Sequence, residues 1–389
     1  MSTKTTYKQT ELGLIPEDWE VKKFNKFSKF YSGGTPLTSK SEYYGGEIPF
    51  IKSGEIYYDR TEQFLTQEGL NNSSAKLVYR GDLLYALYGA NSGEVAISQL
   101  EGAINQAILC IQQNKDEAET IYLYNYLKLE KSNIINKFLQ GGQGNLSADI
   151  IKNLQIPLPP LPEQKKIADC LSTWDVAIEK QNALINALTE RKKALMQQLL
   201  TGKKRLPGFS EEWKEVKLGE ICEIKKGSQI NKIELSSNLG FPVINGGIEP
   251  SGYHDDWNVA ENTITISEGG NSCGFINFIK EKFWSGGHCY TLQNLKININ
   301  KIFLFYFLKN SENQIMKLRV GSGLPNIQQK DIKNFEILLP KIEEQTAIAE
   351  ILATADRELQ LQKEKLAQLQ TQKKGLMQVL LTGKKRLMN

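Results

Sequence analysis

The side chains that could catalyse a reaction are few in this 389-residue chain and are poorly grouped. His254, Cys273, His288 and Cys289 lie within 36 residues, and imidazole and thiolate groups are the ligands that zinc prefers. Their spacing fits no standard zinc site, so ordinary packing is the favoured interpretation. We therefore predict that the chain holds no metal.

Motifs for nucleotide chemistry and for methyl transfer are not found in the sequence either. The TGKKR segments lack the GxxxxGK[ST] pattern of a phosphate loop, and GGQGN at 141–145 is not a dinucleotide-binding loop. Pro159-Pro160 lies outside the kind of Asn/Asp-Pro-Pro-Tyr/Phe loop that grips a flipped adenine. A nuclease site would require a lysine-bearing strand beside its acidic pair, and Asp255-Asp256 has none. We expect a protein without catalytic residues, and an enzyme with an unrecognised site is one alternative.

Two strongly basic segments could supply binding chemistry instead. The net charge of +4 is small, but residues 192–205 and 373–386 each hold five positive and no negative side chains. Such lysines and arginines either stay solvated at a helix C-terminus, where they favour the macrodipole, or contact phosphates. Both interpretations stay open from the sequence. The candidates for phosphate contact are Lys203, Lys204, Arg205, Lys384, Lys385 and Arg386.

Short polar side chains in turns form a second group of candidates. The Gly-rich turns LYGANSGEVAI at 87–97 and ISEGGNSCGFI at 266–276 carry amides and hydroxyls that could reach base edges of DNA. The strand-like segments IPFIKSGEI at 48–56 and FPVINGGIE at 241–249 carry further polar groups. The candidates in these turns are Lys52, Ser53, Asn91, Ser92, Asn245, Asn271 and Ser272.

The elements that position these residues occur twice in the chain. LMQQLLTGKKRL at 195–206 returns as LMQVLLTGKKRL at 376–387, 181 residues later, with 11 of 12 positions identical. At the same offset, 163–206 and 344–387 match at 22 of 44 positions. The offset is too long for a solenoid repeat, so it indicates duplication of a whole structural unit and an approximate two-fold symmetry. Duplex DNA is a partner with matching symmetry.

Both copies predict a long helix with one apolar seam. Apolar residues alternate at spacings of four and three, which is typical of a coiled coil, and each copy has a Gln and a Lys on the seam, Gln181 and Lys192 in the first and Gln362 and Lys373 in the second. Each helix should end near Thr201-Gly202 or Thr382-Gly383, and two such helices in one chain should pack antiparallel. The predicted seam residues are Ile167, Leu171, Ile178, Ile185, Leu188, Leu195, Leu199, Ile348, Leu352, Leu359, Leu366, Leu369, Leu376 and Leu380.

The segments between the helices resemble each other weakly and are expected to be α+β modules. Each begins with a tryptophan phrase around Trp19 or Trp213, continues through short strands, and ends in an aromatic helix at 117–138 or 300–318 and a glycine loop at 141–145 or 321–326. We predict domains at 1–155 and 207–336 for the modules, and at 156–206 and 337–389 for the helical regions. The fold class is therefore α+β, with a pseudo-two-fold arrangement around an antiparallel coiled coil.

The composition and the apolar runs indicate the cellular compartment in which the protein acts. Its five cysteines are odd in number and include no CxxC pair, which favours reduced thiols in the cytoplasm. The N-terminus MSTKTTYKQT is polar, without the features of a signal peptide, and the longest apolar run, IFLFYFL at 302–308, is too short to span a bilayer. We therefore expect a cytoplasmic protein with no membrane partner.

The order module, helix, module, helix resembles the specificity subunit of a Type I restriction-modification system over essentially the whole chain. The resemblance rests on the duplicated LLTGKKRL ends and the P-x-x-x-E-Q start of both helices. Phrases of the first module also match the family, namely Gly34-Thr35-Pro36, the segment 44–50 and Asn105-Gln106. The second module is shorter and keeps only FPVINGG and the glycine turns, as expected where two modules read different sequences.

The resemblance implies a non-catalytic DNA-recognition subunit. Each module would read one half of a split target, and the helices would set the separation of the halves and dock two methyltransferase subunits. S-adenosylmethionine, ATP and Mg²⁺ would act in partner methyltransferase and restriction subunits, with no cofactor in this chain. The alternative is a stand-alone coiled-coil DNA-binding or scaffold protein without a methyltransferase partner.

Overall fold

A computed structural model describes residues 6–138, 145–321, 323 and 325–387 and divides into two compact units. Unit 1 comprises Met1–Gln181 with Lys365–Asn389, and unit 2 comprises Asn182–Glu364. Each unit thus contains one β-rich module and half of each long helix. Within the glycine loops expected from the sequence, residues 141–144, 322 and 324 lie outside the described part of the chain.

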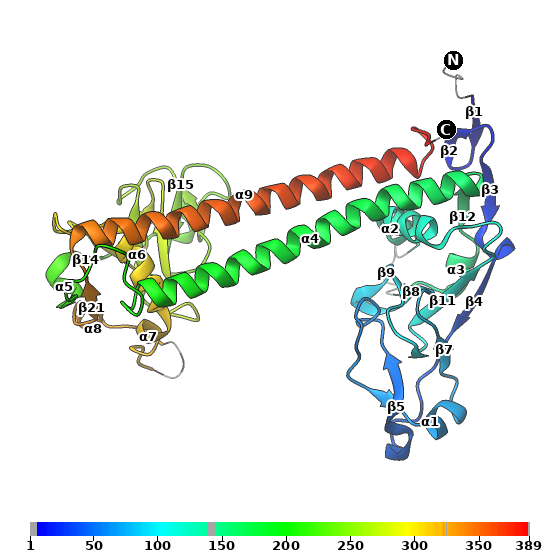
Figure 1. The fold of residues 1–389 in the computed structure, drawn as a ribbon, viewed down its shortest axis with the longest axis horizontal. Coiled ribbons are helices and arrows are strands. Elements are labelled where there is room, and N and C mark those ends of the chain that lie inside the picture. The colour runs from blue at the N-terminus through cyan, green and yellow to red at the C-terminus, as the bar shows by residue number, and fades with distance from the viewer. Residues whose placement is uncertain (1–5, 139–144, 322, 324, 388–389) are drawn as a thin grey trace. The chain divides into compact units, whose positions relative to one another are not determined.

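The two long helices are α4, Leu161–Leu199, and α9, Ile342–Leu380, each of 39 residues. They are the green and orange ribbons labelled in Figure 1. All the seam positions predicted from the heptad pattern are buried or half-buried, while the residues between them are mostly exposed. Each helix stops where a glycine takes a left-handed conformation, at Gly202 with φ +68° and Gly383 with φ +71°.

Within each unit the halves of the two helices run antiparallel. In unit 1 Asp175 of α4 pairs with Lys373 of α9, and Glu163 at the start of α4 pairs with Arg386 beyond the end of α9. In unit 2 Asp356 of α9 pairs with Lys192 of α4, and Glu344 pairs with Arg205. Residue numbers rise along one helix as they fall along the other. The four pairs also form two sets related by the 181-residue offset of the sequence repeat.

Unit 1 contains two four-stranded sheets, ordered β4-β11-β8-β9 and β6-β5-β10-β7. Two two-stranded ribbons, β1-β2 and β12-β3, complete its β structure. The strand that leads into α4, β12, therefore pairs antiparallel with the strand that follows Trp19. The strands are β1 Tyr7–Thr10, β2 Gly13–Pro16, β3 Glu20–Lys23, β4 Ser28–Ser32, β5 Tyr44–Ile51, β6 Phe64–Leu65, β7 Lys76–Val78, β8 Leu83–Ala86, β9 Val95–Ile97, β10 Gly102–Ile104, β11 Ile108–Gln113 and β12 Gln155–Leu158.

The helices of unit 1 pack against this β structure. The aromatic helix expected at 117–138 is α2, Thr120–Phe138, whose buried face contains Tyr122, Leu123 and Leu127. These side chains share one core with the tryptophan anchor Trp19 and with Leu380 of α9. The shorter helices are α1 Gln67–Asn71 and α3 Ala148–Lys152, with 3-10 turns at Phe24–Lys26, Ser41–Tyr43 and Gly89–Asn91.

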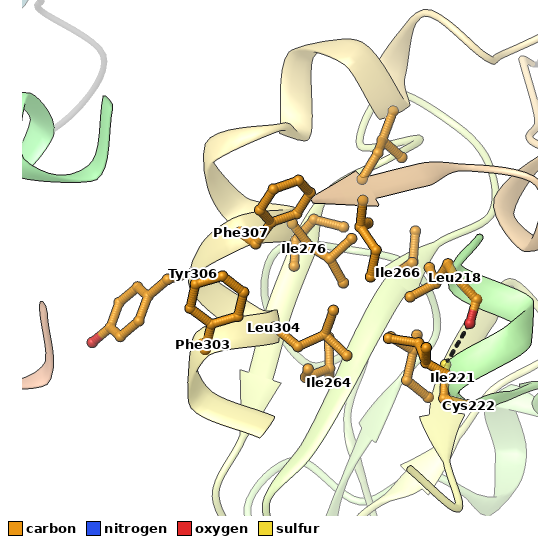
Figure 2. Close-up of a cluster of buried hydrophobic side chains, with 14 of the residues drawn as sticks. Leu218, Ile221, Cys222, Ile264, Ile266, Ile276, Phe303, Leu304, Tyr306 and Phe307 are labelled. Atoms are coloured by element: carbon orange, nitrogen blue, oxygen red, sulfur yellow. Dashed lines mark hydrogen bonds between the residues drawn. The ribbon is translucent and has the colours of Figure 1, made fainter. Parts of the chain in front are cut away.

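Unit 2 repeats this plan with fewer strands. Its main sheet has the order β14-β20-β17-β18, beside a three-stranded sheet β16-β15-β19, and the ribbon β13-β21 leads into α9. Figure 2 shows Ile264, Ile266 and Ile276 of the main sheet facing Leu304 of α6, while Tyr306 points away from the sheet. The strands are β13 Lys214–Lys217, β14 Glu223–Lys226, β15 Phe241–Ile244, β16 Tyr253–His254, β17 Thr263–Ser267, β18 Ile276–Ile279, β19 Trp284–Ser285, β20 Cys289–Gln293 and β21 Glu336–Leu339.

The helices of unit 2 differ from the sequence expectation in one place. A single aromatic helix was expected at 300–318, but the structure has α6, Lys301–Asn310, and α7, Glu312–Met316. The break falls at Ser311, whose N–H is shared between the carbonyl oxygens of Phe307 and Leu308. The other helices are α5 Leu218–Ile221 and α8 Gln329–Lys333, and Lys232–Glu234 is a 3-10 turn.

The predicted fold class, two α+β modules with two long antiparallel helices, is confirmed. Strands β12 and β21 span the predicted boundaries at 155/156 and 336/337, and the domain limits stay a prediction. A heptad pattern marks where a helix begins, but it does not show that the preceding strand pairs with a module. No helix among the described residues is long and apolar enough to cross a membrane.

Candidate nucleic-acid interface

The arginine that follows α9 is held inside unit 1 by an ion-pair cluster that we call the unit 1 clasp: Arg386, Glu163, Asp18 and Trp19. The Arg386 guanidinium donates to both carboxylate oxygens of Glu163, each at 2.7 Å, and to those of Asp18 at 2.7 and 2.8 Å. The Trp19 indole N–H donates to Glu163 at 3.1 Å. Hydrogen bonding to Glu163 raises the pKa of Arg386 above its ordinary value, and hydrogen bonding to Arg386 lowers the pKa of Asp18.

Unit 2 contains the equivalent cluster, the unit 2 clasp: Arg205, Glu344 and Trp213. Arg205 donates two parallel hydrogen bonds of 2.8 Å to Glu344, and the Trp213 indole donates to the same carboxylate at 3.1 Å. The bidentate geometry gives such pairs both strength and orientation. Arg205 and Arg386, two of the six predicted phosphate contacts, thus have carboxylate partners in the structure.

The four lysines of the basic ends are arranged differently from the arginines. Lys203, Lys204, Lys384 and Lys385 are all exposed, directly after the helix-ending glycines. The backbone N–H of Lys204 caps α4 by donating to the Gln198 carbonyl at 3.1 Å, which leaves its side chain to solvent. Their contact with phosphates stays a prediction.

The two lysines at the polar seam positions of the helices form ion pairs. Lys373 is buried and pairs with Asp175, and burial lowers the pKa of its ammonium group. Lys192 pairs with Asp356, which also accepts a hydrogen bond of 2.5 Å from the Tyr306 hydroxyl. These charged groups lie at a fixed height on each helix, so they favour one register of the seam.

In unit 1 the predicted turn residues converge beside the end of β8, which belongs to the sheet β4-β11-β8-β9, the main sheet of this unit. The turn at 52–54 meets the glycine turn, because a Cβ placed on Gly54 would lie 3.4 Å from the Asn91 amide nitrogen. Ser92 is buried and donates to the carbonyls of Leu87 at 3.1 Å and Gly89 at 2.8 Å. Asn91, Lys52 and Ser53 are half-buried, so their polar groups reach the surface at this end of the sheet.

Unit 2 brings its predicted turn residues together in the same way. The Asn245 side chain accepts a hydrogen bond of 3.1 Å from the backbone N–H of His288, and the Ser272 hydroxyl donates to the Gly246 carbonyl at 2.5 Å. Asn271 lies at the tip of the turn and is exposed. The three loops that follow β15 and β17 and precede β20 therefore form one polar surface, which we call the unit 2 loop end: 245–247, 268–274 and 286–288.

The backbone hydrogen bonds show which turn residues are equivalent in the two units. Leu87 N–H donates to Ala107 O in unit 1, and Glu268 N–H donates to His288 O in unit 2, so the 181-residue offset holds here too. At this offset Ser92 corresponds to Cys273, which donates to the carbonyl of Glu268 just as Ser92 donates to Leu87. The visually similar Ser92 and Ser272 are thus one position out of register.

Several polar residues at these loop ends were not predicted from the sequence. In unit 1 Glu94 pairs with Lys131 of α2 and accepts from the Tyr57 hydroxyl. In unit 2 Glu268 accepts from Lys226 at 2.5 Å and from Tyr290 at 3.0 Å. Their partners are 22 to 42 residues away in the chain, and no local pattern signals such contacts.

Two of the four candidate zinc ligands, Cys289 and His254, have different surroundings. Cys289 is buried, and burial raises the pKa of its thiol to about 11. The His254 ring instead packs edge-on against Trp284, with ring centres 5.0 Å apart. Across the residues that the structure describes, no three His, Cys, Asp or Glu side chains are grouped as a metal site requires.

Comparison with known proteins agrees with this architecture. Residues 16–190 and 210–371 each match the Type I restriction modification DNA specificity domain, so that both modules and most of both helices are covered. The chain belongs to the Type I DNA specificity family. It is 28% identical to the Type I restriction enzyme MjaVIII specificity subunit of Methanocaldococcus jannaschii over 410 aligned residues, covering 96% of this chain and 95% of that protein.

Further relatives support membership of the specificity family. A putative Type I specificity subunit of Mycoplasma pneumoniae is 34% identical over 149 residues, or 38% of this chain and 40% of that protein. The crystal structure of a Type I S subunit from M. genitalium superposes with a TM-score of 0.64 at 20% identity, covering 93% of this chain and 96% of the other. That structural similarity concerns the fold.

Proposed function

We propose that this chain is the non-catalytic, sequence-specific DNA-recognition subunit of a Type I restriction-modification complex, acting in the cytoplasm. Each unit reads one half of a bipartite target through the loops at the end of its main sheet. The exposed lysines at 203–204 and 384–385 contact phosphates. The observation that carries the proposal is that both units present loops on an equivalently hydrogen-bonded backbone, with different side chains, and that each unit is joined to an antiparallel helix pair by an equivalent clasp.

The chemistry of the complex is assigned to its partners. Two methyltransferase subunits dock on the long helices and use S-adenosylmethionine, and restriction subunits use ATP and Mg²⁺. A solved relative at TM-score 0.63 comes from work on assembly and conformational transition of a Type I system. If the pure chain bound S-adenosylmethionine stoichiometrically in calorimetry, the non-catalytic assignment would be wrong.

The spacer role of the helices can be tested by deleting one heptad from each, 182–188 and 363–369. Both deletions lie between the ion-paired seam positions, so Asp175–Lys373 and Asp356–Lys192 keep their partners. The helices shorten by about 10 Å, which corresponds to roughly three base pairs of duplex. Deleting a heptad from α4 alone is the control, because it misregisters the seam and destabilises the protein.

Genome-wide mapping of methylated adenines gives the readout. We expect both half-sites to be kept and the gap between them to shorten, unless the altered rotation around the duplex abolishes binding. An unchanged gap with full activity would show that the helices do not set the spacing.

A further inference from the structure

Unit 2 contains a buried carboxylate that the frame of the fold does not require. Glu268 directly follows β17, and its side chain is 9% exposed. Its Oε1 accepts from Lys226 at 2.5 Å and from Tyr290 at 3.0 Å. Its Oε2 is buried without a hydrogen-bond partner among the described residues, and the His288 Nδ1 lies 3.4 Å from it.

The equivalent place in unit 1 is apolar. By backbone hydrogen bonding and strand register, Glu268, His288 and Tyr290 correspond to Leu87, Ala107 and Leu109, and Lys226 corresponds to Ser32. Leu87 and Leu109 belong to the hydrophobic core of unit 1. The same backbone can therefore be built with leucines. A buried charge in their place costs stability, and its presence despite that cost points to a function.

The charges of this cluster reach the surface at the unit 2 loop end. Lys226 ends β14, Glu268 follows β17, and His288 precedes β20, so all three lie at the same end of the main sheet. The side chains of Lys226 and His288 are 50% and 60% exposed, although each faces the buried Glu268. The backbone of His288 is further fixed by Asn245. The Lys226 ammonium and the His288 ring thereby lie against the same carboxylate among the polar loops.

Two adjacent donors match one base edge best. In the major groove guanine presents two neighbouring acceptors, O6 and N7, whereas adenine offers a donor in place of O6. We propose that unit 2 recognises a guanine in its half-site through Lys226 and His288, with Glu268 as the positioning residue that holds both. This inference rests on the proposed function and adds to it the base that is read and the residues that read it.

Phosphate is the other source of acceptor oxygens, and the two differ in what they predict. With a base contact, the affinity depends on the identity of one base pair of the half-site. A phosphate contact contributes equally to the affinity for every sequence and adds to its salt dependence. The test therefore measures preference at single base pairs as well as affinity.

The experiment uses the full chain in complex with its methyltransferase subunits and the target found by mapping methylated adenines. Each guanine of the unit 2 half-site is replaced in turn by adenine, and the affinities of the duplexes are compared. The variants are Lys226→Met and His288→Ala. Lys225→Met is the matched control, because Lys225 is its neighbour on β14, is 51% exposed and pairs with Glu223 instead.

We expect the wild-type complex to prefer guanine over adenine about ten-fold or more at one position. Lys226→Met and His288→Ala should each reduce that preference several-fold, and Lys225→Met should leave it unchanged. Glu268→Leu, which installs the unit 1 residue, should reduce it as well. Glu268→Gln, which keeps an oxygen acceptor for Lys226 and Tyr290, should retain part of it.

Three results would overturn the inference while leaving the proposed function intact. The first is a unit 2 half-site that contains no guanine. The second is that Lys226→Met and His288→Ala both keep the wild-type preference for guanine. The third is that both variants lose affinity equally for guanine and adenine duplexes and show a smaller salt slope. The last would assign the donors to phosphate. Absence of any sequence preference in the wild-type complex would instead contradict the proposed function itself.

Discussion

Arg386 in unit 1 is held by two carboxylates, whereas its counterpart Arg205 in unit 2 is held by one. The Arg386 side chain is 9% exposed and that of Arg205 is 28% exposed. In both units, however, the glutamate comes from the start of the other long helix and also accepts from a tryptophan. The shared part of the clasp therefore joins three elements, and the added Asp18 pair strengthens one copy.

The loop ends differ far more than the clasps do. Where unit 1 has Leu87 and Ala107, unit 2 has Glu268 and His288 on an equivalently bonded backbone. The contacts between helices and modules are therefore repeated in the two units, while the chemistry presented by the loops is not. Such a division suits two recognition surfaces of different specificity on a common frame.

The largest expected effect comes from forcing the two units to be identical. A half chain ending near Leu206 keeps the first module and α4, and its own Arg205 can occupy the place of Arg386 beside Glu163 in a second copy. We expect a homodimer that directs methylation to a palindrome of the first half-site. Sedimentation gives the stoichiometry, and methylome mapping gives the target.

If the half chain retained the original asymmetric target, the modular assignment would be wrong. A half chain carrying Arg205→Ala is the matched control, since it lacks the clasp that replaces Arg386–Glu163.

Removing the glutamate of the clasp should destabilise unit 1 more than unit 2. Glu163→Ala leaves Arg386 buried with only Asp18, and loss of a buried pair should cost about 3 kcal/mol. Glu344→Ala should cost roughly 1–2 kcal/mol, because the more exposed Arg205 can be hydrated. Hydrogen exchange measured separately in each unit checks both values, with exposed Glu179→Ala as control. Equal losses would show that Asp18 and burial make no difference.

The exposed lysines should affect DNA affinity without affecting either clasp. Lys203→Ala with Lys204→Ala, and separately Lys384→Ala with Lys385→Ala, should weaken target and non-target DNA about equally. Each lost phosphate contact should lower the slope of log affinity against log salt by about 0.9. The double variant Lys363→Ala and Lys365→Ala, on exposed positions of α9, is the control. Unchanged slopes would show that the basic ends are merely solvated.

The smallest effect concerns the additional carboxylate of unit 1. Hydrogen bonding to Arg386 lowers the pKa of Asp18 below 3.8, so its stabilisation is present above that value and is lost as pH falls through the lower, folded-state pKa. Because Asp18 is 49% exposed, Asp18→Asn should cost less than about 1 kcal/mol at neutral pH.

Denaturant unfolding across pH provides the measurement. The difference between wild type and Asp18→Asn should vanish in acid, and Glu212→Gln, which precedes Trp213 as Asp18 precedes Trp19, is the control from unit 2. A difference that persisted unchanged into acid would rule out the ion pair as its cause.

The sequence by itself determined the elements that repeat. A heptad seam and a glycine stop are local signals, and an offset of 181 residues is visible without coordinates, so the long helices and the duplication could be predicted. The shared Glu163-Gln164 and Glu344-Gln345 were visible as repeated residues, but nothing local connected the glutamates to arginines 223 and 139 residues away.

Only the tertiary structure decided what the polar groups contact. In the folded chain the arginines of the basic ends pair with carboxylates, and the Ser92 hydroxyl donates to a carbonyl of its own turn. Lys226, Glu268 and His288 lie together at one end of a sheet. The physical reason is that a hydrogen bond depends on distance in space. Strand pairing brings together residues that are far apart in sequence, and propensity and periodicity describe only near neighbours.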